Sequence, residues 1–137
     1  MTKATTGQRV GAFLLDFLFS FPLALIWMIP FIGTIVGGFL LFLYWLFRDV
    51  MRPSLGKKIV GLDVAALNYG PPSTGSLILR NLLLALPTLI AMIPLVGVVG
   101  FGLDLFVILV EFILLISTGI RLGDRMASTI VVERSKT

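Results

Sequence analysis

Three acidic residues lie inside long apolar runs of the sequence, where ionised side chains are rare. Asp16 is the only charged residue in the run 10–47, and Asp104 and Glu111 lie within the run 77–120. A charge at the centre of a bilayer costs at least about 2.5–3.5 kcal/mol on insertion scales. Such carboxylates therefore need a partner, water or a proton. Because burial disfavours the ionised form, they are candidates for a path that binds a cation or exchanges a proton.

The spacing of these carboxylates allows a functional and a structural interpretation, and both stay open at this point. Glu111 follows Asp104 by seven residues, which places both on one face of a helix, and Thr118 continues this polar stripe. In the functional interpretation, the stripe and Asp16 line an ion path. In the structural interpretation, other polar side chains neutralise the carboxylates and fix the packing of the helices. The candidate partners are Arg9, Arg80, Asn81 and Arg125.

The composition excludes several kinds of chemistry. The 137 residues include no Cys and no His, which rules out disulfides, the usual zinc sites, a thiol nucleophile and an imidazole base. No Gly-x-Ser-x-Gly element is present either. We therefore expect no enzymatic activity, no cofactor and no metal. Hydrophobic residues make up 58% of the chain and charged residues 13%, with a mean hydropathy of +1.07, which is typical of a membrane-embedded protein.

Each apolar run is too long to cross a membrane once. The first would form a helix about 57 Å long, against about 30 Å for the apolar core of a bilayer. Each run contains a proline followed three residues later by a glycine, Pro30 with Gly33 and Pro94 with Gly97, and this pattern favours a turn. The predicted spans are 10–29, 33–50, 77–93 and 97–120.

The segment between the two runs and the segment after the second run differ from the spans. The loop 51–76 is charged and rich in Pro, Gly and Ser, and it contains a short strand-like stretch at 59–64. A second such stretch lies at 129–132. We therefore expect a single all-α integral membrane domain over 1–137, with four transmembrane helices as two tandem hairpins and two short strand-like segments.

The two hairpins resemble each other in sequence. The stretch 28–33, Met-Ile-Pro-Phe-Ile-Gly, recurs at 92–97 as Met-Ile-Pro-Leu-Val-Gly. A Leu-Gly pair and a β-branched stretch follow each hairpin. This pattern predicts an internal repeat with both copies in the same orientation. The alternative is that apolar hairpins look alike because they share a solvent and a turn.

The basic residues indicate the orientation. All eleven Lys and Arg lie before residue 10, between 48 and 80, or from 121 onward, and the positive-inside rule then places both termini and the loop 51–76 in the cytoplasm. We expect a multi-pass protein of the cell membrane. Topology explains the basic character better than nucleic-acid binding does. Lys57 and Lys58 are candidates for contact with acidic lipid head groups, although such lysines also serve simply to set the orientation.

Several motifs together resemble the RDD family of membrane proteins, which is named for one arginine and two aspartates. They are Arg9 with Asp16 in the first span, the element 52–64 with Leu-Gly-Lys-Lys, Leu-Arg-Asn at 79–81, and the closing segment 123–132. The resemblance assigns the family's arginine to Arg9 and its aspartates to Asp16 and Asp124. It implies a membrane protein without one settled activity, since cation/proton antiport has been proposed for some members. We further expect Arg9 to pair with Asp124.

Two functions follow from these observations. The first is a small cation- or proton-coupled transporter that uses the buried carboxylates Asp16, Asp104 and Glu111. Its partners would be the lipid bilayer and a monovalent cation or proton, and, because four helices enclose little volume, a second copy in a homodimer. The second is a non-catalytic membrane scaffold or assembly factor that recruits a partner through the loop 51–76 and the C-terminal tail.

Overall fold

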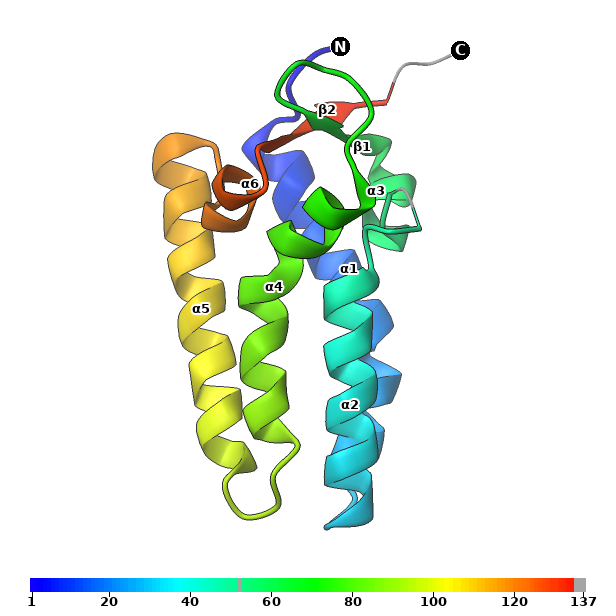
Figure 1. The fold of residues 1–137 in the computed structure, drawn as a ribbon, viewed down its shortest axis with the longest axis vertical. Helices are drawn as coiled ribbons and strands as arrows, with labels where there is room; N and C mark the ends of the chain where they lie inside the picture. Colours follow the sequence, from blue (N-terminus) through cyan, green and yellow to red (C-terminus); the bar gives the residue numbers. More distant parts are fainter. Residues whose placement is uncertain (52, 135–137) are drawn as a thin grey trace.

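Four long helices run side by side along the molecule and carry a small polar cap at one end. The structure, a computed structural model, describes residues 1–51 and 53–134. The N-terminus lies at the capped end, as do the last residues that the structure describes (Figure 1). The long helices are α1 (Thr6–Trp27), α2 (Ile32–Phe47), α4 (Thr74–Ala91) and α5 (Gly97–Thr118). The cap contains α3 (Leu55–Val60), α6 (Leu122–Met126), β1 (Leu62–Ala66) and β2 (Thr129–Glu133).

Local signals explain where the first helix of each hairpin begins. The Thr5 side chain accepts a hydrogen bond from the backbone N–H of Gln8, and the Gln8 side chain accepts one from the backbone of Thr5. This reciprocal cap satisfies two of the free N–H groups at the start of α1. Ser73 begins α4 in a similar way, because its hydroxyl accepts from the backbone of Ser76.

Glycine lets the two helices of each hairpin approach closely. A Cβ atom at Gly37 would lie 2.3 Å from the backbone nitrogen of Trp27, and one at Gly100 would lie 2.3 Å from that of Ala91. Any larger residue would force the helices apart at these points. The hairpin ends also contact each other, since the Trp27 indole donates a hydrogen bond of 2.8 Å to the Ala91 carbonyl.

The two halves of the chain share one order of elements: two long helices, a short helix and a strand. Their turns share an uncommon backbone conformation, with φ values of 60° at Phe31 and 72° at Leu95. A positive φ is rare for residues other than glycine. These likenesses agree with the predicted repeat, while duplication of an ancestral unit stays a prediction.

The strands of the cap pair with each other, so that the chain's two halves meet there. Strands β1 and β2 are antiparallel, with Leu62 opposite Glu133. The prediction of a strand over 59–64 was wrong at its start, because residues 59 and 60 belong to α3. The Ser54 hydroxyl caps that helix, and Gly61 ends it with a φ of 79°.

Each long helix packs mainly on the next one along the chain. Helix α1 packs on α2, α2 packs on α4, and α4 packs on α5. Helices α1 and α5 make little contact with each other. One aromatic pair joins them, since the rings of Phe13 and Phe112 meet edge to face at 5.1 Å.

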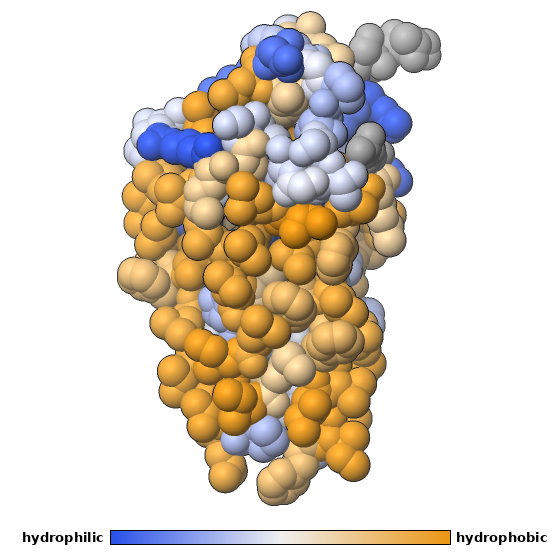
Figure 2. All heavy atoms as spheres, in the orientation of Figure 1, coloured by the Kyte–Doolittle hydropathy of each residue, from blue (hydrophilic) through white to orange (hydrophobic). Residues whose placement is uncertain are grey.

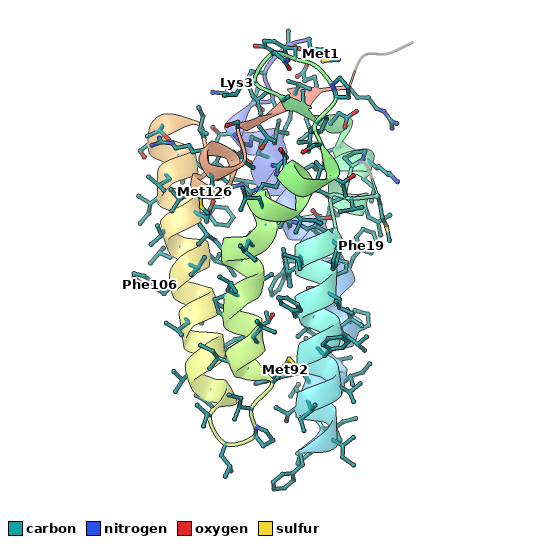
Figure 3. The ribbon with its side chains drawn as sticks, in the orientation of Figure 1. Met1, Lys3, Phe19, Met92, Phe106 and Met126 are labelled. Atoms are coloured by element: carbon teal, nitrogen blue, oxygen red, sulfur yellow. The ribbon has the colours of Figure 1, made fainter. Side chains whose placement is uncertain are left out.

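The outer surface of the long helices is apolar. Figure 2 shows hydrophobic residues over most of their length and hydrophilic residues gathered at the cap. Phe106, for example, points away from α5 (Figure 3) and is 62% exposed. Helices α1, α4 and α5 are long and apolar enough to cross a membrane, while α2 is apolar but has 16 residues. The second predicted span, 33–50, is shorter in the structure because α2 ends at Phe47.

Candidate functional site

A network of buried charged side chains lies where the long helices meet the cap. Its residues come from α1, α4 and α5, from the segment that follows α2, and from the cap helices α3 and α6. Its carboxylates are Asp16, Asp49, Glu111 and Asp124, and its basic side chains are Arg9, Arg48, Lys57, Arg80 and Arg121.

Asp16 of α1 is held by the segment that follows α2. It accepts hydrogen bonds of 2.7 Å from the Ser54 hydroxyl and 2.8 Å from the Gly56 backbone N–H. The Arg48 guanidinium lies 3.4 Å away. The approach of α3 to α1 requires glycine, because a Cβ at Gly56 would lie 2.1 Å from the Ala12 carbonyl oxygen.

Asp49 connects this segment to α4. The Asn81 amide donates a hydrogen bond of 2.9 Å to one of its oxygens, and Lys57 forms an ion pair with the other. The Arg80 Nε atom lies 3.5 Å from the same carboxylate. Asp49 therefore has one amide and two basic partners in the described part of the chain.

Asp124 of α6 has three arginine partners. Arg80 donates a hydrogen bond of 2.7 Å, Arg121 lies 3.4 Å away, and Arg9 forms an ion pair with the second oxygen. The Arg9 guanidinium also donates to the Gly119 carbonyl at 2.7 Å. Asp124 thus joins α1, α4 and the C-terminal segment.

Glu111 of α5 is held by the start of α6 in a manner similar to Asp16. It accepts a hydrogen bond of 3.1 Å from the Gly123 backbone N–H, and Arg121 lies 3.8 Å from its other oxygen. A Cβ at Gly123 would lie 2.1 Å from the Arg80 carbonyl oxygen, so close packing again requires glycine. The Leu-Gly pair of each half therefore presents a backbone N–H to a carboxylate in a long helix.

The network surrounds a cavity of about 30 Å³, large enough to hold water. Asp16 and Glu111 line it from α1 and α5, and Phe13 and Phe112 form part of its apolar wall. Three buried polar atoms in this region have no hydrogen-bond partner among the described residues: Nε and Nη1 of Arg80 and Oε2 of Glu111. The site therefore combines a small cavity with two hydrogen-bond donors and one hydrogen-bond acceptor that have no partner among the described residues.

The cap side of the network has perturbed electrostatics. Burial raises the pKa of Asp124, but Arg80, Arg121 and Arg9 outweigh it and hold that pKa well below its ordinary value. Lys57 and the neighbouring arginines lower the pKa of Asp49 in the same way. Burial lowers the pKa of Lys57 to about 7, against the opposing effect of Asp49.

Comparison with protein families gives one match. The model of the RDD family matches residues 3–128, nearly the whole chain. The chain belongs to the RDD family. Neither the comparison with curated proteins nor that with solved structures finds a match. The protein is thus an RDD membrane protein with several apolar helices.

The residues assigned to the arginine and aspartates of the RDD family meet in this network. The ion pair expected between Arg9 and Asp124 is present. Asp16 lies in the same network, but its basic partner is Arg48 rather than Arg9. The three residues therefore belong to one buried structure without forming a direct triad.

The structure separates Asp104 from the other two span carboxylates. Asp104 is partly buried on α5, does not line the cavity, and has no ion pair among the described residues. Thr118, at the other end of the expected stripe, is exposed and bonded to Arg125 at 2.9 Å. The stripe along this RDD protein's α5 is therefore not a continuous path, and Glu111 alone faces the cavity.

The expectation that Lys57 and Lys58 both contact lipid head groups was wrong for Lys57. Helix α3 turns Lys57 inward onto Asp49, where it is buried, whereas Lys58 is exposed. Among the described residues, none of the four partners expected for Asp16, Asp104 and Glu111 bonds one of them. Arg125 bonds Thr118, Arg9 and Arg80 bond Asp124, and Asn81 bonds Asp49. Successive residues of a helix point about 100° apart, so one lysine of the pair can be buried while its neighbour is exposed.

Sequence reasoning missed three members of the network: Arg48, Asp49 and Arg121. A signal was available, since Arg48 and Asp49 directly follow an apolar run and Arg121 directly follows another. Charges at such positions often mark only the end of a span. A group of three acidic side chains that could hold a metal ion is absent from residues 1–51 and 53–134.

Proposed function

We propose that this RDD protein is a small proton-coupled ion transporter in which all four long helices cross the cell membrane. The capped end would face the cytoplasm, because the basic residues gather there. One observation carries the proposal: Asp16 and Glu111, from two different apolar helices, line the same cavity. Groups that are costly to place in a membrane usually line the path of an ion or proton.

The ion pairs suggest how the path would operate. Both cavity carboxylates have an arginine at 3.4–3.8 Å and a backbone N–H donor. Protonation of Asp16 would weaken its attraction to Arg48, and protonation of Glu111 would weaken its attraction to Arg121, which Asp124 also holds. A proton can therefore move the basic groups without any large change of the helices. Lys57, with its pKa of about 7, would exchange protons on the cap side.

The geometry favours a proton over a metal cation as the coupled ion. A monovalent cation would have to displace an arginine from Asp16 or Glu111, and it would enter a cavity that all five basic groups of the network line. A proton neutralises a carboxylate without such displacement. Since four helices enclose little volume, we also propose a homodimer, in which the second copy contributes the rest of the path.

Proton flux in proteoliposomes tests the proposal. An internal pH-sensitive dye would report the decay of an imposed pH gradient. We expect Asp16→Asn and Glu111→Gln to lower the flux at least about a hundredfold, the lower end of the range that single proton-transfer groups contribute. Asp104→Asn is the matched control, because it removes a carboxylate from the same helix outside the cavity. Full flux in both cavity variants, with the fold intact, would exclude this path.

A second candidate function is a membrane scaffold, and one feature of the cap supports it. A groove of about 350 Å³ lies beside the sheet and is lined by Met1, Tyr69, Pro71 and Pro72, among others. Deleting the loop would be a poor test, because the loop segment contributes Lys57 and Ser54 to the network. Tyr69→Ala instead changes only the groove. The scaffold function predicts that this variant loses a larger complex on native gels, while Asp16→Asn retains it.

A further inference from the structure

The cavity carries an excess of positive charge. All five basic side chains of the network line it, but only two of the four carboxylates, Asp16 and Glu111, do so. Among the described residues, the whole network holds five basic groups and four carboxylates. A buried charge without a counter-charge is strongly unfavourable. One negative charge in the cavity would balance the network.

Arg80 supplies donors for such a charge. It is fully buried, and its Nη2 atom donates to Asp124 at 2.7 Å. Its Nε and Nη1 atoms have no hydrogen-bond acceptor among the described residues. Nε lies 3.5 Å from Asp49, which is an ion-pair distance without hydrogen-bond geometry. Buried guanidinium N–H groups without acceptors are costly, and an anion is their best acceptor.

We propose that this cavity is a binding site for one small monovalent anion of the size of chloride, held chiefly by Arg80. The volume of about 30 Å³ suits a single small ion. The inference rests on the proposed function for its biological role, since it names the ion that would accompany the proton. Binding itself, however, can be measured whether or not the protein transports anything.

Lys57 would link the anion to the proton. It faces Asp49 and Arg48 from the end of α2, Arg80 from α4, and Asp16 from α1. With Lys57 protonated the network has one positive charge in excess, and with Lys57 neutral the charges are equal. The anion therefore binds best when Lys57 carries its proton. Affinity falls as the pH rises through 7, the region in which Lys57 loses its proton.

A chloride titration of the purified full-length protein in detergent tests the site. Line broadening of the ³⁵Cl NMR signal reports binding, with gluconate replacing chloride at constant ionic strength. We expect saturable broadening at pH 6, and an affinity at least about fivefold lower at pH 8.5, because the excess positive charge is lost. Absence of saturable broadening at both pH values would overturn the proposal and leave only water in the cavity.

Two variants separate anion binding from simple damage to the fold. Glu111→Gln keeps an acceptor for Gly123 but removes a negative charge from the cavity, so we expect chloride affinity to rise about tenfold. Lys57→Gln removes a positive charge and should both weaken binding and abolish its pH dependence. Asp104→Asn should leave affinity unchanged. Damage to the fold would lower affinity in every variant, so weaker binding in folded Glu111→Gln would contradict the site.

The outcome also distinguishes the two proposals. Chloride binding with these charge effects, in a protein that shows no proton flux in proteoliposomes, would retain the anion site and exclude the transport function. Proton flux that depends on Asp16 and Glu111 without any chloride binding would retain the transport function and exclude the anion site.

Discussion

The guanidinium of Arg80 donates a hydrogen bond to the carboxylate of Asp124, with 2.7 Å between the two atoms. This contact joins α4 to α6 in the middle of the buried network. Arg80 also lies 3.5 Å from Asp49, so one side chain spans two carboxylates from different segments. Arg80, which helps to hold the cap on the helices, therefore also lines the cavity.

Replacing Asp124 should destabilise the protein strongly. Asp124→Asn keeps the size of the side chain but removes the charge that three buried arginines share. Loss of one partner from a buried ion pair typically costs about 3–5 kcal/mol. Unfolding of the variant in mixed micelles, followed by tryptophan fluorescence, measures this change. Asp63→Asn, on β1 outside the network, should change the free energy of unfolding little, and an equal loss in both variants would contradict the assignment.

Below neutral pH, the stability of the protein should fall only when the solution becomes strongly acidic. The pKa values of Asp49 and Asp124 are lower in the folded protein than the ordinary value of 3.8. The unfolded chain therefore binds these protons first, and the stabilisation is present above pH 3.8 and lost as the pH falls further. Thermal unfolding between pH 7 and pH 2 tests this. A melting temperature that falls steeply between pH 7 and pH 5 would be inconsistent with these shifts.

Lys57 should make the stability depend on pH on the alkaline side as well. Its pKa is about 7 in the folded protein against an ordinary value of 10.5. Between these values the unfolded chain binds more protons than the folded protein, so the free energy of unfolding should rise with pH. Lys57→Met should remove this rise. The matched control is Lys58→Met, which changes the exposed neighbour, and a pH profile unaltered by Lys57→Met would show that Lys57 does not titrate in this window.

The packing of α6 on α4 gives a prediction without any charge. A methyl group at Gly123 would lie 2.1 Å from the Arg80 carbonyl oxygen, whereas nothing lies within 4 Å of one at Gly102. We expect Gly123→Ala to displace α6 and lower the melting temperature by several degrees, an effect of about 1–3 kcal/mol. Gly102→Ala, in the middle of α5, should be neutral or stabilising. Equal melting temperatures would show that α6 can move without loss.

The helical hairpins were predictable because their signals are local. Apolar runs too long for one crossing, each broken by proline and glycine, place the turns near Pro30 and Pro94, and the four helices follow. The error at residues 59 and 60 arose because β-branched composition outweighed the capping residues Ser54 and Gly61.

The network was only partly predictable, because its contacts join residues distant in sequence. Arg9 and Asp124 are 115 residues apart, and shared depth in the membrane was enough to suggest their pairing. The pairing of Asp16 with Arg48 depends on how the segment after α2 folds back onto α1. The spacing of apolar residues along the sequence does not determine that fold. The prediction that Asp104 and Glu111 line one path was wrong, because only Glu111 lines the cavity. Seven-residue spacing places two residues on one helix face, but it does not show which part of that face meets a neighbouring helix.

Proton flux through proteoliposomes that contain the wild type, Asp16→Asn or Asp104→Asn tests the central claim most directly. The account predicts rapid dissipation of a pH gradient by the wild type and by Asp104→Asn, and a flux near that of empty liposomes for folded Asp16→Asn. Equal rates for the wild type and Asp16→Asn, or a loss confined to Asp104→Asn, would contradict it.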